Sequence, residues 1–429
     1  MKVLIVSLYH PELVRGGSQK IAFELFKGLK KIDGVDSVLL ASVDHTTPEL
    51  YKNGARITGF DNRSGEFLFL SQDYDYVWQK SGNVLLAKSF SEFLKLIQPE
   101  VVHFHHFLTY GIDFLTLTRR TLPDAKIVFT AHEFLSICAA DGHMLRRNDR
   151  SLCAYASPIR CHQCMPHLPP EHYFMREVWM KEHLAAVDVF TVPSRFMISR
   201  YSDWGLDQDK FVCVTNGLDI ESNVRLMSES LPGKRNRFGF FGQLVDVKGL
   251  TVLIDAITIL RSQGFYNFIV EINGDNIQFA SPECRQKIER FLDDEASRPL
   301  SDRNVIFNGS YNHDQLHPRM SRVDWVVVPS IWWEIFGLVI SEAWSFGRPV
   351  IASNVGGPSE RITHGVDGLL FEMGDARALA AMIYKASTEE GLWDHLSSGI
   401  KPQPHRDEMV ADYLSVYRGV VHKNGMSAG

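Results

Sequence analysis

The sequence lacks the features by which a protein grips nucleic acid or crosses a membrane. Among its 429 residues, 45 Lys and Arg stand against 51 Asp and Glu, which gives a formal net charge of −6 at pH 7. Such a chain offers no broad cationic surface to a phosphate backbone, so we predict no nucleic-acid partner. It also has no run of the roughly 18 apolar residues that a membrane-spanning helix needs.

An export signal is absent as well. The apolar start at Val3–Val6 is interrupted by His10 and Pro11, and no small-residue cleavage site follows. Cysteine is scarce, with six in the whole chain, which is typical of a reducing compartment where disulfides are rare. We therefore predict a cytoplasmic protein. Peripheral contact with the inner face of the cell membrane, through residues 144–147 or 174–176, stays an open alternative.

Two common nucleotide-binding motifs are missing. The chain has neither G-x-G-x-x-G nor the lysine pattern of a P-loop, which disfavours nicotinamide dinucleotides and P-loop chemistry. In their place, Gly16 and Gly17 follow the first apolar run and directly precede a helical pattern. Glycines allow close backbone approach and a helix N-terminus attracts anions, so the turn suits a phosphate. An ordinary tight turn is the alternative.

Short apolar runs alternate with amphipathic helical segments along the whole chain. Examples are Val101–Phe104 in the first half, and Phe238–Phe241 and Trp325–Pro329 in the second. Continuous apolar strands alternating with helices indicate parallel sheets covered on both faces. The fold class is therefore α/β, with Rossmann-like, doubly wound sheets.

The alternation pauses between about residues 216 and 237, where Asn216-Gly217 and Pro232-Gly233 break regular structure. We place a domain boundary there. The predicted domains are 1–215 and 216–404. Residues 405–429 follow as a last helix that adds no strand and that we expect to pack back on the first domain.

Candidate chemistry follows the strand expected at Trp325–Pro329. Gly337 suits the mouth of a helix whose first amides, those of Gly337, Leu338 and Val339, are open to a diphosphate. Glu334 precedes this helix and Glu342 lies inside it, so both carboxylates can accept hydrogen bonds from a sugar or ribose diol. Spacing alone leaves open that both acids are ordinary helix residues.

A second candidate is Lys248, which follows Gln243 in the loop after the strand at Phe238–Phe241. It stands at the entrance of a helix, where the helix dipole disfavours a cation unless an anion is also bound. A lysine at this unfavourable position indicates a bound phosphate. The alternative is an exposed surface lysine without a ligand.

Histidines follow two strands of the first half. His105 and His106 come after Val101–Phe104, and His132 comes after the next strand. Imidazole can accept a proton from a hydroxyl or donate to a phosphate oxygen near neutral pH. We assign a functional role to His132 and treat His105 and His106 as acceptor-side candidates. His103 is expected to be a hydrogen-bonded packing residue.

Four of the six cysteines fall within one predicted insertion, residues 138–167. Two of them form a C-x2-C knuckle, and four thiolates suit a tetrahedral, structural zinc ion. We therefore predict a zinc site, with a metal-free thiol loop as the alternative; its ligands would be Cys138, Cys153, Cys161 and Cys164.

Together these residues resemble the family 4 retaining glycosyltransferases of the GT-B class, over nearly the whole chain. The specific part is Glu334 and Glu342, separated by seven residues, in a context that comprises Pro329-Ser330, Phe336-Gly337-Leu338, Gly347-x-Pro349 and Val355-Gly356-Gly357-Pro358-Ser359-Glu360. The resemblance implies two Rossmann-like domains facing each other across a cleft. The first would bind the acceptor and the second a nucleotide sugar.

The resemblance also implies roles for single residues. Glu334 would bind the hydroxyls of the donor sugar and Glu342 the ribose. Lys248 would neutralise the leaving diphosphate, and His132 would lie near the reacting centre. The donor-binding set implied in full is Gly16, Gly17, Gln243, Lys248, Glu334, Phe336, Gly337, Leu338, Val339 and Glu342.

Gln243 departs from the family pattern, because many members carry an arginine there. A neutral amide binds phosphate less strongly than a guanidinium does. We name Arg15 as a cation that could replace it.

The resemblance thus implies a retaining hexosyltransferase that needs no metal for catalysis and takes a UDP- or GDP-linked sugar as co-substrate. The acceptor would be a glycan or a lipid-linked molecule in polysaccharide or glycoconjugate synthesis. Two alternatives stay open. One is a sugar-nucleotide-binding scaffold with impaired catalysis, and the other is a different GT-B enzyme such as a sugar-nucleotide epimerase.

Overall fold

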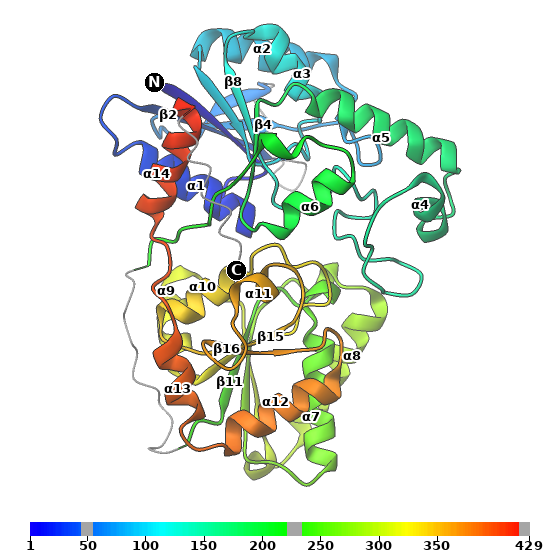
Figure 1. The fold of residues 1–429 in the computed structure, drawn as a ribbon, viewed down its shortest axis with the longest axis vertical. Helices are drawn as coiled ribbons and strands as arrows, with labels where there is room; N and C mark the ends of the chain where they lie inside the picture. Colours follow the sequence, from blue (N-terminus) through cyan, green and yellow to red (C-terminus); the bar gives the residue numbers. More distant parts are fainter. Residues whose placement is uncertain (44–54, 221–233, 420–429) are drawn as a thin grey trace. The chain divides into compact units, whose positions relative to one another are not determined.

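The computed structural model describes residues 1–43, 55–220 and 234–419. The chain divides into two compact units, one made of Met1–Asp219 with Pro404–Gly429 and the other of Ile220–Gln403 (Figure 1). Part of the predicted boundary segment, residues 221–233, and the last residues, 420–429, lie outside the described ranges. Both units are α/β, with sheets that are almost entirely parallel, as the alternating pattern predicts.

The first unit contains an eight-stranded sheet in the order β10-β9-β8-β7-β1-β2-β4-β3, in which only β3 runs antiparallel to its neighbour. The strands are β1 (Lys2–Ser7), β2 (Asp36–Val43), β3 (Ile57–Gly59), β4 (Glu66–Leu70), β7 (Val101–Phe104), β8 (Lys126–Thr130), β9 (Val189–Val192) and β10 (Phe211–Cys213). A separate hairpin joins β5 (Tyr74–Asp75) to β6 (Lys80–Ser81).

Its helices are α1 (Gly17–Leu29), α2 (Val84–Ile97), α3 (Asp113–Thr121), α4 (Pro158–Cys164), α5 (Pro170–Leu184) and α6 (Phe196–Asp203), and the 3₁₀ turn η2 (Gln208–Lys210) follows α6. The central strand β1 is buried from Val3 to Val6 because sheet neighbours lie on both edges and helices cover its faces. On α1, the residues at helical spacing, among them Ile21 and Leu25, are fully buried.

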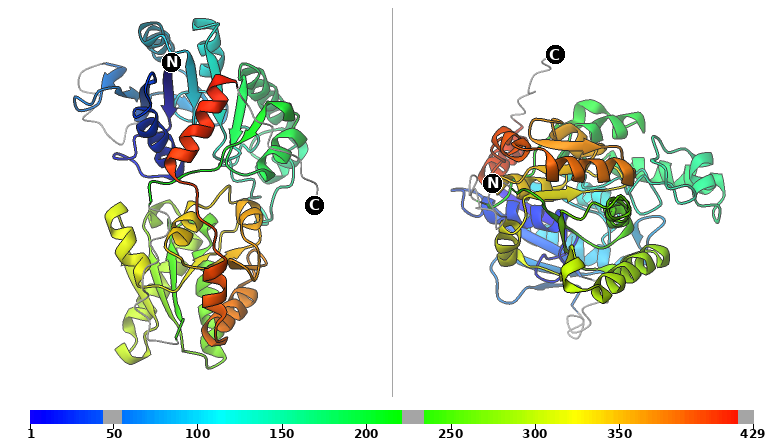
Figure 2. Two further views of the ribbon diagram at one scale, coloured as in Figure 1. Left: turned by 60° about the vertical axis from the view of Figure 1, so that its left-hand side comes forward. Right: turned by 90° about the horizontal axis from the view of Figure 1, so that it is seen from below.

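The last helix, α14 (Arg406–Arg418), belongs to the first unit and runs beside α1 (Figures 1 and 2). The contact is close at Gly28, where a Cβ atom would lie 2.4 Å from Cγ2 of Val410. The buried guanidinium of Arg406 donates to the carboxylates of Glu24 (3.3 Å) and Asp219 (2.5 Å). Packing and charge thus hold this helix against α1, although it lies almost four hundred residues away in sequence.

The second unit contains a six-stranded, wholly parallel sheet in the order β13-β12-β11-β14-β15-β16. The strands are β11 (Arg237–Phe241), β12 (Ile269–Asn273), β13 (Val305–Gly309), β14 (Trp325–Val328), β15 (Val350–Ser353) and β16 (Gly368–Phe371). The helices are α7 (Leu250–Ser262), α8 (Pro282–Ser297), α9 (His313–Ser321), α10 (Leu338–Ser345), α11 (Gly356–Arg361), α12 (Ala376–Thr388) and α13 (Leu392–Gly399), with the turns η3 (Asp246–Lys248), η4 (Ile277–Phe279) and η5 (Leu300–Asp302).

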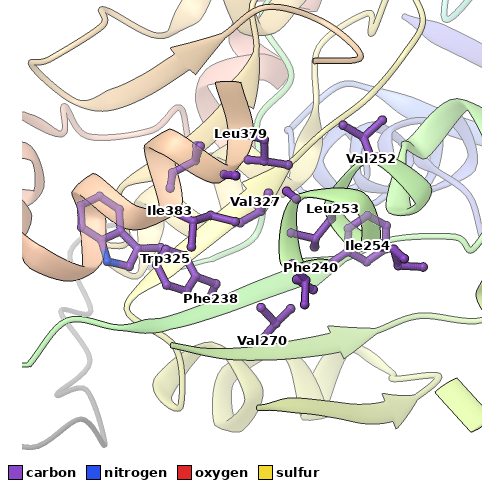
Figure 3. Close-up of a cluster of buried hydrophobic side chains, with 14 of the residues drawn as sticks. Phe238, Phe240, Val252, Leu253, Ile254, Val270, Trp325, Val327, Leu379 and Ile383 are labelled. Carbon is purple, nitrogen blue, oxygen red and sulfur yellow. The ribbon is translucent and has the colours of Figure 1, made fainter. Parts of the chain in front are cut away.

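The core of this second unit lies on both faces of the sheet. On one face, α7 and α12 cover β11 and β14, and Figure 3 shows Phe238 and Trp325 in one layer with Leu253 of α7 and Ile383 of α12. On the other face, Met320, Val326, Ile340 and Trp344 belong to a second cluster. Because β11 and β14 are central and buried on both sides, the loops that follow them are held on a rigid base.

No helix within the described ranges is long and apolar enough to span a membrane. Of the segments that the sequence left open to bilayer contact, Met144 and Leu145 are buried and so is Arg176, so these three side chains do not face a bilayer. Phe174 and Met175, on α5, are exposed.

Candidate functional site

In the second unit, Lys248 lies at the carboxyl end of β14 because the turn that carries it packs tightly against the backbone after that strand. It closes the turn η3 after β11, and Gly249 follows as the N-cap of α7 in the left-handed region, with φ of 71°. A Cβ atom on Gly249 would lie 1.8 Å from the carbonyl oxygen of Pro329. Only glycine therefore lets this turn approach the loop after β14, where the predicted acids begin.

Lys248 and Glu334 form an ion pair. The Nζ atom donates to Oε2 of Glu334 at 2.7 Å, and Ser330 Oγ (2.9 Å) and Trp332 Nε1 (3.2 Å) donate to the same oxygen. Burial alone would raise the pKa of the Glu334 carboxyl, but Lys248 and the two neutral donors together hold its pKa below the ordinary value. Glu334 is thus a buried carboxylate that keeps its charge.

The second oxygen of Glu334 is the one left for a ligand. Among the residues that the structure describes, every side-chain donor to Glu334 binds Oε2, and Oε1 has no partner. The side chain is only 6% exposed. A carboxylate oxygen that none of these donors engages can accept a hydrogen bond from a ligand, so Oε1 suits the hydroxyl of a bound molecule.

Gly337 forms the mouth of α10. It is the N-cap in the left-handed region, with φ of 72°, and Leu338 and Val339 are the first helical residues after it. A glycine N-cap has no side chain to accept hydrogen bonds from the first helical amides. Those amides face the end of the helix that attracts anions.

The other residues predicted to bind the donor in this unit are Phe336, Glu342 and Gln243, and none of them contacts the Lys248–Glu334 pair through a hydrogen bond described above. Phe336 is buried, with the guanidinium of Arg361 3.8 Å from its ring centre. Glu342 is buried on α10 beside Tyr311, whose pKa is raised first by burial and then by the charge of Glu342. Gln243 is exposed on the loop after β11. The structure thus joins Lys248 to Glu334 directly, and it places Glu342 beside Tyr311.

In the first unit, Gly16 is the extended N-cap of α1 and Gly17 its exposed first residue. The loop that leads to them is anchored by the fully buried His10, which sequence reasoning noted only as a break in an apolar run. Its Nε2 lies 3.0 Å from Oε2 of Glu66, and its carbonyl accepts from Leu13 and Val14. Burial lowers the pKa of His10, so the ring is neutral at pH 7 and donates to the carboxylate.

Three of the histidines meet because β7 and β8 are adjacent and parallel. His105 Nδ1 lies 3.0 Å from His132 Nε2, which joins the ends of the two strands. His103 is a packing residue, as predicted, since its two ring nitrogens contact Tyr417 Oη (2.7 Å) and Thr130 Oγ1 (2.6 Å). The other ring nitrogen of His105, Nε2, is buried and has no partner among the described residues.

Burial also sets the charges of this histidine cluster. It lowers the pKa of His132 to about 3 and that of His106 to about 4, so both rings are neutral at pH 7. Glu133 lies 3.5 Å from His106, and burial raises the pKa of its carboxyl to about 8. Because Nδ1 of His106 accepts from the amide of Leu108, its Nε2 carries the hydrogen that faces the neutral carboxyl of Glu133. His132 is a neutral base.

Sequence reasoning missed the residues that hold the segment after His132. The buried guanidinium of Arg176, on α5, donates to the carbonyls of Leu135 (2.6 Å) and Ser136 (3.0 Å). The hydroxyl of Tyr201, on α6, donates to the carbonyl of Glu133 (2.8 Å). Arg176 falls on the buried stripe of α5, three residues after Tyr173 and four before Met180, and this spacing is the signal that could have marked it as a buried arginine.

The cysteine insertion does not support the zinc prediction. Cys138, Cys153, Cys161 and Cys164 line one cavity of about 30 Å³. However, within residues 1–43, 55–220 and 234–419 no group of three or more His, Cys, Asp and Glu side chains is arranged to hold a metal ion. The thiol of Cys138 donates to the carbonyl of Ala140, and burial raises its pKa to about 12. In this arrangement the thiol of Cys138 is protonated and hydrogen-bonded to the backbone.

Comparison with known proteins identifies the family of this chain. The family described as Glycosyltransferase Family 4 matches residues 15–222, and the family described as Glycosyl transferases group 1 matches residues 226–401. Together the two matches cover most of the chain. It therefore belongs to the family 4 glycosyltransferases, with the GT-B fold.

The relatives found by sequence are partial matches. An uncharacterized glycosyltransferase of Methanocaldococcus jannaschii is 25% identical over 244 residues, which are 54% of this chain and 59% of that protein. The lipopolysaccharide 1,2-N-acetylglucosaminetransferase of Salmonella typhimurium is 28% identical over 183 residues, or 41% and 47% of the two chains. The matched region spans only about half the length of these relatives.

Solved structures match over the full length. Sucrose-phosphate synthase of Thermosynechococcus elongatus is 18% identical with a TM-score of 0.70, over 98% of this chain and 99% of that one. HepE of Anabaena, solved in complex with UDP-glucose, is 17% identical with a TM-score of 0.63, over 97% and 100%. At these identities the likeness establishes the fold.

Proposed function

We propose that this protein transfers a sugar from a nucleoside diphosphate sugar, linked to UDP or GDP, to a glycan or lipid-linked acceptor in polysaccharide or glycoconjugate synthesis. The observation that carries the proposal is the Lys248–Glu334 pair beside the N-terminus of α10. It combines a cation, a charged buried acceptor with one open oxygen, and helical amides. The UDP-glucose complex of HepE, a structure of the same fold, supports this class of donor.

Each part of the pair has a proposed role. The amides of Gly337, Leu338 and Val339 bind the diphosphate, beside Phe336, and Lys248 neutralises charge on it. Glu334 accepts from a sugar hydroxyl through Oε1, and Glu342 accepts from the ribose. Gly16 and Gly17 are assigned to the donor by their place at the N-terminus of α1 and by the family resemblance, and Gln243 by the resemblance alone.

Transfer would follow from these charges. Breaking the bond between the sugar and the diphosphate leaves negative charge on the leaving oxygen, which the amides and Lys248 stabilise without a divalent ion. The acceptor hydroxyl would attack on the face from which the phosphate departs, with the phosphate taking the proton, so that the anomeric configuration is retained. His132, which is neutral and can accept a hydrogen bond, is proposed to lie at the reacting centre, with His105 and His106 on the acceptor side.

A second candidate is a donor-binding protein with impaired transfer. Gln243 favours it, because a neutral side chain stands where many family members carry an arginine, and it is exposed on its loop. Arg15, in the loop before α1, is proposed to supply the missing cation.

A two-stage assay separates the candidates. The first stage measures the shift in thermal unfolding midpoint with UDP-glucose, UDP-N-acetylglucosamine and GDP-mannose, because a ligand that binds only the folded state raises that midpoint. The second incubates the stabilising donor with glycan and lipid-linked acceptors and follows product formation. Product with retained configuration supports the enzyme. Donor binding without product from any acceptor supports the binding protein, and no shift with any donor contradicts both.

A further inference from the structure

Arg361, in the second unit, contacts the backbone at the mouth of α10, where the diphosphate is proposed to bind. Arg361 is the last residue of α11 and is half-buried. Its Nη1 atom donates to the carbonyl oxygens of Phe336 (2.9 Å) and Gly337 (3.2 Å), and its Nη2 atom donates to Ser341 Oγ (2.6 Å) and Gln403 Oε1 (2.9 Å). The guanidinium thus binds two successive peptide units at the mouth of α10.

Because the peptide bond is planar, binding of these two carbonyls also fixes the direction of the N–H groups in the same peptide units. In a trans peptide unit the C=O and N–H bonds point in opposite directions. Because the carbonyls of Phe336 and Gly337 are directed at Arg361, the N–H groups of Gly337 and Leu338, in the same two peptide units, are directed away from it. These are two of the three amides assigned above to the diphosphate.

The helix that carries Arg361 is fitted closely against the loop. The amide of Gly357 donates to the carbonyl of Glu334 at 2.7 Å. A Cβ atom on Gly357 would lie 2.4 Å from the carbonyl oxygen of Ile335. The first turn of α11 therefore contacts the residues that precede Gly337, and Arg361 at its end contacts Gly337 itself.

The remaining contacts fix the guanidinium in its own place. Its centre lies 3.8 Å from the ring centre of Phe336 and 5.3 Å from that of Trp344, so aromatic rings restrict its plane. Ser341 and Gln403 bind the second nitrogen, Nη2. A planar fork with several donors can satisfy these oxygens together, whereas the single ammonium of a lysine is a point charge on a flexible stem.

From these contacts we infer that Arg361 is a positioning residue for diphosphate recognition: it orients the amides of Gly337 and Leu338 toward the donor without touching it. The inference rests on the proposed function, since it concerns the same donor site. It assigns to α11 a part in binding the diphosphate and none in binding the nucleoside.

Calorimetric titration with paired probes tests this role. UDP, UMP, GDP and GMP are titrated into the wild-type protein, Arg361→Met and Arg361→Lys, with folding checked by thermal unfolding. For the nucleotide pair that the wild type binds, we expect both variants to bind the diphosphate about tenfold more weakly, as the loss of charge-assisted hydrogen bonds implies, and the monophosphate less than about threefold more weakly. Arg348→Met is the control, because Arg348 is a buried arginine of the same unit that contacts Met320 and the ring of Trp393. It should leave the preference for diphosphate unchanged.

The outcomes distinguish this inference from the proposed function. Unchanged diphosphate affinity in a folded Arg361 variant, or an equal loss for diphosphate and monophosphate, overturns the positioning role while the proposed function stands. If Arg361→Met does not fold, Arg361→Lys decides by the same criterion. A wild-type protein that binds neither UDP nor GDP contradicts the proposed function, and the positioning role falls with it.

Discussion

Glu334 keeps a negative charge at a position where burial alone would remove it. Three donors, from Lys248, Ser330 and Trp332, converge on one of its oxygens and hold the pKa below the ordinary value. Ser330 belongs to the motif quoted from the sequence and Trp332 lies two residues before Glu334, yet no pattern assigned either side chain a role. Hydrogen bonds made by loop side chains depend on the path of the loop, which periodicity does not describe.

Replacing this carboxylate tests its role with little change in shape. We expect Glu334→Gln to lower kcat/KM for the donor by about 100-fold, because an amide accepts more weakly and Lys248 loses its ionic partner. The free energy of unfolding should fall by about 1–3 kcal/mol. Glu289→Gln, which removes one acid of an exposed ion pair on α8, is the control and should change neither quantity. A fully active Glu334→Gln protein would exclude the carboxylate from sugar recognition.

Glu133 makes the stability of the first unit depend on pH. Its pKa is about 8 in the folded protein, against an ordinary value of 4.5. Between these values the folded state holds a proton that the unfolded state releases, so the free energy of unfolding falls as pH rises, by up to about 1.4 kcal/mol per pH unit. Urea denaturation at pH 7 and pH 8 should show this fall in the wild type and a smaller one in Glu133→Gln.

The chosen pH range isolates that carboxyl from the histidines. His106 and His132 have lowered pKa values, so their contribution is lost only as pH falls below about 6.5, with the opposite sign. Glu92→Gln, an exposed acid on α2, should keep the wild-type pH dependence. Equal slopes for the wild type and Glu133→Gln would show that Glu133 is ionised in the folded protein.

At the scale of elements, the turn η3 and the first residue before α7 decide where Lys248 stands. We expect Gly249→Ala to lower the free energy of unfolding by more than about 2 kcal/mol, because it combines a left-handed backbone with a clash against the carbonyl of Pro329. Gly264→Ala is the matched control: its φ is 77°, but nothing lies within 4 Å of the added Cβ atom. It should cost only about 1 kcal/mol. Equal costs in chemical denaturation would mean that the turn can shift away from Pro329.

The strands were the elements that the sequence predicted best. The run Val101–Phe104 matches β7 at both ends, and the runs at Phe238 and Trp325 match β11 and β14 to within a residue. Buried parallel strands are continuous apolar segments, so composition alone locates them. The contact of α11 with the mouth of α10 could not be predicted in this way. Arg361 reaches Gly337 across 24 residues of sequence, and no local pattern encodes that pairing.

At the scale of the whole molecule, the chain folds as two α/β units, each built on its own sheet. Strand alternation predicted the fold class, and the motif around Glu334 predicted the family, because that combination of glycines and acids is specific. The zinc prediction has no support among the described residues, because ligand spacing in sequence does not fix the direction of each thiol. Within the insertion, Cys138 and Cys153 donate to backbone carbonyls.

Calorimetric titration of Lys248→Met with UDP, GDP and their monophosphates tests the central claim most directly, namely that Lys248 and the mouth of α10 bind a nucleoside diphosphate. Lys287→Met, which removes a cation of an exposed pair, serves as the control. We predict that the wild type and the control bind one diphosphate more tightly than its monophosphate, and that Lys248→Met loses at least about tenfold in diphosphate affinity. Diphosphate binding that is absent from the wild type, or that is equally tight in Lys248→Met, would contradict the account.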